Sequence, residues 1–383
     1  MSMIKLVSDT IDKRDINRLV EWLSQDEIPR LTKGDITIEF ENKWSNKIGV
    51  NYTTYVNSGS SAILLSLAAL KESSKLRNNK IIVPALSWLT DVSSPIQLGM
   101  DVLLCDCNLK DLSIDIEHLK QIIIDEDPSC LILVSVLGLV PNMTEIVNIC
   151  KENNIILIED VCESMGSKFE DKYLGTFGDI SLFSLYYGHH LSTIEGGLIC
   201  TNDTELNDII ISMRSHGWDR DWSKDKQKEY RDKYNIDDFN SLYTFYYPGF
   251  NFRSTDLQAF IGITQVDKLD NFSINRERNF KLYNDNITIN ELNIKYDDKN
   301  FISNFAYPIV SKNREIIVNK LIENNIEVRP LIAGSMARKP FWKGKVDNLP
   351  NCDIINNNGF YIPNHQNLNS NDILKICNIV NEK

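Results

Sequence analysis

The sequence lacks cysteines at the Cys-x-x-Cys spacing of metal and redox sites. Its eight cysteines form no Cys-x-x-Cys pair, and none lies between Cys200 and Cys352. In a chain of ordinary globular composition, scattered cysteines are typical of buried, reduced thiols. We therefore expect no disulfide framework.

Long apolar segments are also missing. The most apolar run, from Leu131 to Val140, is too short to cross a bilayer. The segment MSMIKLVSDTIDKRD at the N-terminus has no apolar stretch of the kind found in signal peptides. We therefore expect a cytoplasmic protein.

Basic residues are outnumbered by acidic ones. The chain carries 53 acidic and 41 basic residues, which gives a net charge of −12. An acidic surface argues against general nucleic-acid binding, which depends on positive charge. A small anionic ligand needs only a local cluster of donors, so the charge does not exclude one.

The length and the hydrophobic pattern predict a two-domain α/β protein. A chain of 383 residues is too long for one compact core. Short apolar runs, typical of strands covered on both faces, alternate with helical stretches such as Ser60 to Leu70 and Thr144 to Lys151. The predicted strands are Thr53 to Val56, Lys80 to Val83, Val102 to Cys105, Leu131 to Val136, Ile155 to Ile158, Ile180 to Tyr186 and Gly197 to Thr201.

A long helical pattern follows this region. It begins at Thr255 and runs to about Tyr283, and we expect it to link a large domain, residues 1–265, to a smaller α/β domain, residues 266–383. In the smaller domain, NREIIVNKLIENN is the clearest amphipathic helix.

Two segments offer groups that suit a ring with a phosphate. In VNSGSSAILLSLAAL a strand ends and a helix begins, so Ser60 and Ser61 stand where helix amides can hold an anion. Taken alone, the segment favours the alternative, a simple helix cap. In VPALSWLTD, Trp88 follows a strand at the edge where α/β sheets bind ligands, although a packed tryptophan is the alternative.

Two further segments offer groups for proton chemistry. In NIILIEDVCESMGS, Asp160 ends an apolar strand and Glu163 lies one predicted helical turn later, where either carboxylate could instead cap a helix. In GTFGDISLFSLYYGHHLSTIEGG, Ser184 lies in a strand, and His189 and His190 follow it. Adjacent histidines at a strand end favour a functional role over a structural one.

A last segment, YYPGFNFRSTDLQAFIG, stands just before the long helix. It contains Asn251 and Arg253, and the alternative is a turn in which Ser254 or Thr255 caps the helix.

Together and in this order, these segments resemble the DegT/DnrJ/EryC1/StrS sugar aminotransferases, which have the type I pyridoxal-phosphate fold. The likeness covers nearly the whole chain and rests on the stretches NSGSSA, VPALSW, LIEDVCESMGS, GTFGDISLFSLYYGHH, STIEGG and GFNFRSTDLQAFIG. It implies a large mixed-sheet domain and a smaller C-terminal α/β domain.

The resemblance also implies roles for these residues. Ser60, Ser61 and Ser184 would bind the cofactor phosphate. Asn251 would reach the phosphate of a neighbouring subunit, which implies a homodimer with shared sites.

Three further residues would surround the cofactor ring. The resemblance implies that Trp88 stacks on the ring, that Asp160 binds its nitrogen, and that Glu163 approaches its hydroxyl.

One departure from the family pattern is informative. The aminotransferases carry a lysine at the position that His189 occupies here. Imidazole cannot form a Schiff base with an aldehyde, so pyridoxal or pyridoxamine phosphate would be held non-covalently. His189 can still move protons, because an ordinary histidine pKa is about 6.5.

Histidine at this position resembles the 3-dehydratase branch of the family. This implies removal of the 3-hydroxyl of a nucleotide-linked 4-keto-6-deoxy sugar, with glutamate as amino donor. The phrase YYGHHLSTIEGG favours the GDP-4-keto-6-deoxymannose enzymes, although CDP stays open. Because a related CDP-sugar enzyme holds an iron–sulfur cluster with cysteines in the stretch that lacks them here, we expect no such cluster.

The nucleotide diphosphate needs cationic partners. Candidates are Arg220, Arg253, Arg329 and Lys339, of which Arg329 lies in the branch-like segment VRPLIAGSMARKPFW. Two alternatives remain for the whole protein: a sugar aminotransferase that uses a histidine base, and a non-catalytic relative that only binds cofactor or nucleotide sugar.

Overall fold

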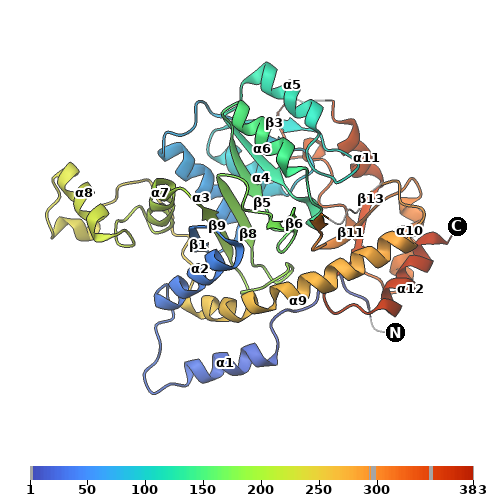
Figure 1. Ribbon diagram of the computed structural model, residues 1–383, viewed down its shortest axis with the longest axis horizontal. Helices are drawn as coiled ribbons and strands as arrows, with labels where there is room; N and C mark the ends of the chain where they lie inside the picture. The colour runs from blue at the N-terminus through green and yellow to red at the C-terminus, as the bar shows by residue number, and fades with distance from the viewer. Residues whose placement is uncertain (1–2, 293, 295–298, 345–347, 383) are drawn as a thin grey trace.

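The computed structural model describes residues 3–292, 294, 299–344 and 348–382. A seven-stranded sheet lies at its centre, in the order β1-β9-β8-β5-β4-β2-β3 (Figure 1). Strand β9 is antiparallel to both its neighbours, and the other neighbouring pairs are parallel. The strands are β1 (Tyr52–Val56), β2 (Lys80–Pro84), β3 (Asp101–Cys105), β4 (Cys130–Val134), β5 (Ile156–Asp160), β8 (Ile180–Ser184) and β9 (Gly197–Thr201).

Both faces of this sheet are covered, which explains the nearly continuous apolar strands. Along β4, Ile132 and Val134 pack into one hydrophobic cluster, whereas Leu131 and Leu133 pack into the other. Successive side chains of a strand point to opposite faces, so a strand between two helical layers needs apolar residues at every position. The predicted α/β architecture is confirmed.

Helices cover the two faces of the sheet. Several helices begin at a residue whose side chain caps them, for example Asp203 before α7, which accepts the N–H of Leu206. The helices before the long linking helix are α1 (Lys13–Leu23), α2 (Asp35–Ile48), α3 (Gly59–Glu72), α4 (Leu89–Gln97), α5 (Ile116–Glu126), α6 (Met143–Glu152), α7 (Thr204–Arg214) and α8 (Lys224–Tyr234), with short 3-10 turns η1 (Val136–Gly138) and η2 (Asn240–Tyr243).

The long helix α9 (Asp256–Asn286) runs from the large sheet to the C-terminal elements (Figure 1). Thr255 is its N-cap, with Oγ1 accepting the N–H of Gln258 at 3.2 Å. The C-terminal elements are β11 (Ala306–Val310), α10 (Arg314–Glu323), β12 (Arg329–Pro330), η3 (Met336–Arg338), α11 (Pro350–Asn358), β13 (Gly359–Pro363) and α12 (Ser370–Asn381), and their sheet has the order β11-β13-β12.

Two contacts connect distant parts of the chain. Near the N-terminus, Ile4 forms a parallel bridge with Ile326, just after α10. A small sheet of β10 (Asn300–Phe301), β6 (Lys168–Phe169) and β7 (Lys172–Tyr173) joins a segment after α9 to the large-sheet region. The predicted boundary at residue 265 falls inside α9 and stays a prediction.

Three local predictions differ from the structure. The strand expected to reach Val136 ends at Val134, and Val136 begins the 3-10 turn η1. The strand expected to reach Tyr186 ends at Ser184, because the chain turns there and the N–H of His189 donates to the Tyr186 carbonyl at 2.9 Å. Residues after Asp160 form turns rather than the expected helical turn. Within the described residues, no helix is long and apolar enough to span a membrane.

Candidate active site

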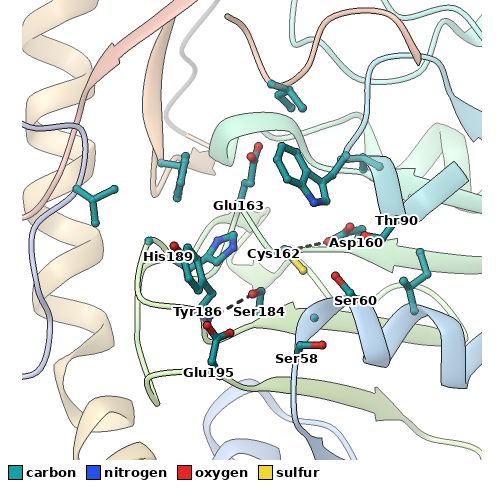
Figure 2. Close-up of a pocket in the computed structure, with 18 of the residues that line it drawn as sticks. Ser58, Ser60, Thr90, Asp160, Cys162, Glu163, Ser184, Tyr186, His189 and Glu195 are labelled. Atoms are coloured by element: carbon teal, nitrogen blue, oxygen red, sulfur yellow. Dashed lines mark hydrogen bonds between the residues drawn. The ribbon is translucent and has the colours of Figure 1, made fainter. Parts of the chain in front are cut away.

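A cavity of about 450 Å³ opens at the carboxyl ends of β5 and β8 and beside the first turn of α3. Ligands bind in this position in open α/β sheets, because loops from several strands converge there. Figure 2 shows polar side chains from these loops around the cavity. Its polar and aromatic lining includes Ser58, Ser60, Trp88, Thr90, Asp160, Cys162, Glu163, Ser184, Tyr186, His189, Glu195, Phe305 and Tyr361.

The first turn of α3 forms one end of the cavity. Ser58 caps this helix, with its Oγ accepting the N–H of Ser61 at 3.0 Å. A Cβ added at Gly59 would meet the Cβ of Ser184 at 2.9 Å, so the helix start and the end of β8 approach closely. A helix N-terminus flanked by the hydroxyls of Ser58, Ser60 and Ser184 suits an anion such as a phosphate.

This geometry gives different surroundings to Ser60 and Ser61, two of the three serines expected to bind phosphate. Ser60 lines the cavity. Ser61 instead belongs to the cap, because its N–H donates to Ser58 Oγ and its hydroxyl accepts from the hydroxyl of Ser58 at 3.0 Å. Ser58, which the sequence reading did not select, is at the cavity.

Asp160 and Glu163 face the cavity from the turns after β5. Asp160 Oδ1 accepts the N–H of Cys162 at 2.8 Å (Figure 2). Glu163 Oε2 accepts the N–H of Leu137 at 3.0 Å. Burial raises the pKa of Glu163 to about 7, with Asp160 adding to the shift and the Leu137 N–H opposing it.

The two histidines differ in their surroundings. His189 lines the cavity, and its ring lies between those of Tyr186 and Phe305, with centroid distances of 6.3 and 5.5 Å. His189 Nδ1 is buried and has no hydrogen-bond partner among the described residues. His190 is fully buried, and its Nε2 contacts the Ser303 carbonyl oxygen at 2.8 Å. Only His189 is therefore placed for chemistry in the cavity.

The protonation of His189 follows from its burial. Burial lowers the pKa of His189 to about 4, while the nearby carboxylate of Asp160 opposes the shift. A histidine with a lowered pKa is neutral at physiological pH and can accept a proton.

Trp88 is the N-cap residue of α4, and 56% of its surface is exposed. Its indole belongs to the cavity lining. An exposed indole at a ligand cavity can stack on a flat ring.

The expected cationic residues are more scattered. Arg329 lines a smaller neighbouring cavity of about 240 Å³, together with Lys5, and pairs with Glu327 at 2.6 Å. Arg220 packs over the ring of Trp218, 3.8 Å from its centroid. Neither of these two cavities, as the described residues form them, is lined by Arg220, Arg253 or Lys339.

Asn251 also lies away from these cavities as the described residues form them. Its Oδ1 accepts from Arg253 Nε at 3.1 Å, and both side chains are accessible. The expected contact of Asn251 with a neighbouring subunit stays a prediction.

Several lining residues were not selected from the sequence. Tyr186 and Glu195 lie within the GTFGDISLFSLYYGHHLSTIEGG stretch, where their side-chain directions depend on the turn after β8. Phe305 and Tyr361 come from the C-terminal part, and only the packing around α9 brings them to the cavity.

The lining fits a flat, phosphate-bearing cofactor such as pyridoxal phosphate. It combines the N-terminus of α3 beside Ser184, which suits an anion, with the indole of Trp88 and the carboxyl groups of Asp160 and Glu163. The imidazole of His189 adds a buried nitrogen without a described hydrogen-bond partner. It presents an imidazole at the position where the aminotransferases carry a lysine.

The chain is similar to known proteins over most of its length. The chain is 36% identical over 348 residues to GDP-4-keto-6-deoxy-D-mannose 3-dehydratase of Escherichia coli O55:H7, covering 88% of this chain and 89% of that protein. Two crystal structures of GDP-4-keto-6-deoxymannose-3-dehydratase, one with a trapped PLP-glutamate geminal diamine and one of a mutant with bound GDP-perosamine, match with a TM-score of 0.88 at 30% identity, covering 98% of this chain and 100% of theirs. Residues 9–381 match the DegT/DnrJ/EryC1/StrS aminotransferase family, and the chain belongs to that family.

Proposed function

We propose that this protein is a pyridoxal-phosphate-dependent 3-dehydratase of a nucleotide-linked 4-keto-6-deoxy sugar, with GDP-4-keto-6-deoxymannose as substrate and glutamate as amino donor. The observation that carries the proposal is His189, a neutral imidazole in the cavity where a family aminotransferase needs a primary amine. The 36% identity to a 3-dehydratase of this sugar supports the substrate class.

The residues would hold the cofactor as follows. Ser58, Ser60 and Ser184 line the cavity at the start of α3 and would bind the phosphate, and Trp88 would stack on the ring. Asp160 would accept a hydrogen bond from the ring nitrogen and keep it protonated. When bound, the cofactor supplies the electron sink that allows the 3-hydroxyl to leave.

His189 is the residue that would transfer protons in the reaction. It is neutral at physiological pH, so it can take a proton, and its ring is held between Tyr186 and Phe305. The protonated imidazole can then return a proton to the leaving hydroxyl. Because His189 could both take up the first proton and protonate the leaving hydroxyl, the reaction needs no second acid.

The overall reaction balances. Replacing the 3-hydroxyl by hydrogen is a two-electron reduction of the sugar, and conversion of glutamate to 2-oxoglutarate and ammonia supplies both electrons. One water leaves the sugar and one is consumed in releasing ammonia. The products are therefore a 3-deoxy-4-keto sugar, 2-oxoglutarate and ammonia.

The neighbouring cavity suits the charged part of the substrate. Lys5 and Arg329 line it, and both can pair with phosphate or carboxylate groups. We place the cationic contacts of the nucleotide sugar there, ahead of Arg220, Arg253 and Lys339. We also assign the protein to the cytoplasm, where nucleotide sugars and glutamate are available.

We also propose that the protein forms a homodimer. The accessible pair of Asn251 and Arg253 lies away from the cavity of its own chain and would reach the phosphate site of a second copy. Size measurement in solution, together with restored activity on mixing N251A and H189N proteins, checks this. Mixed proteins that stay inactive would remove Asn251 from a shared site.

The decisive experiment supplies the purified protein with pyridoxal phosphate, glutamate and GDP-4-keto-6-deoxymannose. We expect ammonia, 2-oxoglutarate and a sugar lighter by one oxygen in the mass spectrum. His189→Asn should lose this activity while still binding the cofactor, because asparagine preserves size and polarity but cannot exchange protons.

The same assay separates the alternatives. An amino sugar formed without ammonia would identify an aminotransferase that works with a histidine base. Cofactor binding without change in glutamate or sugar would identify a non-catalytic relative. Turnover of the CDP-linked sugar in preference to the GDP-linked one would correct the nucleotide.

A further inference from the structure

A second carboxyl group lies behind Asp160. Asp91, in the first turn of α4, is 0% exposed, whereas Asp160 lines the cavity. Asp91 Oδ2 accepts the backbone N–H of Trp88 at 3.2 Å. Asp160 is close enough to act on the Asp91 carboxyl, because burial raises the pKa of Asp91 and the charge and side-chain hydrogen bonding of Asp160 both raise it further. Asp91 therefore connects the residue expected to cover the ring with the residue expected to bind its nitrogen.

One oxygen of Asp91 has no hydrogen-bond donor among the described residues. Its Oδ1 is buried, and no described N–H or O–H group donates to it. Two ionised carboxylates in contact would repel each other, and the unpaired oxygen would lose its hydration without compensation. One proton shared by the pair removes both costs, because one carboxyl can then donate to the other.

The surroundings assign that proton to Asp91. Asp160 already accepts the N–H of Cys162 at 2.8 Å and reaches the cavity, whereas Asp91 is fully buried and has an oxygen without a donor among the described residues. Burial raises the pKa of Asp91 well above its ordinary value, and the charges of Asp160 and Glu163 add to the shift. The adjacent thiol of Cys162 also has a raised pKa through burial and stays neutral.

We propose that Asp91 is a protonated carboxylic acid that donates a hydrogen bond to Asp160 and holds it as the anion facing the cofactor ring nitrogen. This rests on the proposed function only in making Asp160 the partner of that nitrogen. A donor to an ionised carboxylate lowers its proton affinity, so the shared proton stays on the ring. Asp91 acts through Asp160 and is a positioning residue.

The first test uses the protein without cofactor. We expect the infrared spectrum at neutral pH to contain the carbonyl stretch of a protonated carboxylic acid, and we expect D91N to lose it. Glu163 and Glu159 also have raised pKa values from burial, so the band must be taken from the difference between wild type and D91N. A difference spectrum without a carboxylic acid band would overturn the proposal.

The second test uses the cofactor-loaded protein. In D91N the side-chain amide can still donate to Asp160, whereas leucine in D91L has similar size and no donor. With ring-15N-labelled cofactor, we expect D91N to keep the ring nitrogen protonated and D91L to shift its signal toward neutral pyridine. Loss of one hydrogen bond to a charged group predicts a kcat for D91L lower by about 10- to 100-fold.

The outcomes are separable. KM for the sugar should stay unchanged in D91L, because Asp91 does not reach the cavity lining as the described residues form it. If D91L does not fold, D91A gives the same comparison. A ring nitrogen as protonated in the donor-less variant as in wild type would overturn the proposal. Failure of the wild type to bind cofactor would instead overturn the proposed function, and the infrared result would still decide the protonation of Asp91.

Discussion

The rings of His189 and Phe305 are in contact, with centroids 5.5 Å apart and planes inclined by 42°. The backbone of Phe305 is held on both sides: its N–H donates to the Leu137 carbonyl at 2.9 Å, and its carbonyl accepts from Arg276 Nη1 at 2.9 Å. Arg276 is buried on α9. The position of the imidazole in the cavity therefore depends on packing between the C-terminal segment and the linking helix.

Replacing Phe305 with leucine should impair proton transfer more than folding. Leucine keeps an apolar contact but removes the flat ring that supports His189. A small displacement of a reacting group slows the reaction strongly. Because His189 would be less firmly positioned, we expect kcat to fall by about 10- to 100-fold. The assay is ammonia release at saturating glutamate and sugar.

A matched control is available in Phe169→Leu. Phe169 pairs with Phe177 at a centroid distance of 6.0 Å and is not among the described residues that line the cavity. F169L should change stability without changing kcat at a temperature where it is folded. Wild-type kcat in F305L would show that the ring contact does not position His189.

Replacing Asp160 with alanine should separate cofactor binding from turnover. The phosphate and ring-stacking contacts involve other residues, so the cofactor should still bind, with an unprotonated ring nitrogen. An electron sink then no longer forms, and we expect turnover to fall by at least about 100-fold. Fluorescence titration gives the cofactor Kd, and product formation gives kcat. Weak cofactor binding with intact turnover at saturating cofactor would contradict this role.

The sequence predicted the parts of the site that follow from local rules. Asp160 ends an apolar strand, as expected, so its place at the sheet edge follows from strand direction. Thr255 precedes an amphipathic helix and caps it, one of the two caps considered. These features depend on a few neighbouring residues and on the burial of both sheet faces.

Other parts depended on packing that the sequence does not display. In NSGSSA each of three serines can cap a helix, and only the backbone conformation makes Ser58 the cap and leaves Ser60 at the cavity. His189 and His190 are adjacent in the chain, yet the turn after β8 sends them into different surroundings. Phe305 is held at the site by residues that are distant in the sequence, so no local sequence pattern predicts its position.

A methyl group added at Gly59 should weaken binding of the cofactor phosphate at the start of α3. The added Cβ would lie 2.9 Å from the Cβ of Ser184 and 3.2 Å from its Oγ, so Ser184 must move. We expect G59A to raise the cofactor Kd by about tenfold or more, which corresponds to losing one charge-assisted hydrogen bond. Equilibrium dialysis with pyridoxal phosphate measures this directly.

Gly49→Ala is the control for backbone strain. Gly49 has a φ of +85°, and a Cβ there would meet nothing within 4 Å. G49A should therefore lose about 1 kcal/mol of stability through its left-handed backbone while leaving the cofactor Kd unchanged. Equal Kd values for G59A and wild type would place the phosphate elsewhere.

His365 should make the protein less stable in acid. It is 8% exposed, and its Nδ1 accepts the N–H of Asn367 at 3.2 Å. Burial lowers the pKa of His365 to about 4, with the charge of Arg276 adding to the shift, and protonation would also remove the acceptor at Nδ1.

The sign of the effect follows from the lowered pKa. Between the unfolded value of about 6.5 and the folded value, the unfolded chain binds the proton and the folded chain does not. The stabilisation is fully present above pH of about 6.5 and is lost as the pH falls toward 4, to a limit of about 3 kcal/mol for one such group. Glutamine at position 365 cannot take up the proton, so H365Q should show a smaller fall in unfolding free energy.

Urea denaturation of wild type and H365Q at pH 7 and pH 5 measures this difference. Glu163 acts in the opposite direction, because its raised pKa means that its contribution is lost as the pH rises toward 7. It is present in both proteins, as are His189 and His190, so their contributions cancel in the comparison. The free energy of unfolding of wild type should therefore fall more steeply from pH 7 to pH 5 than that of H365Q, and parallel pH dependences would show that His365 takes up its proton equally in the folded and unfolded chains.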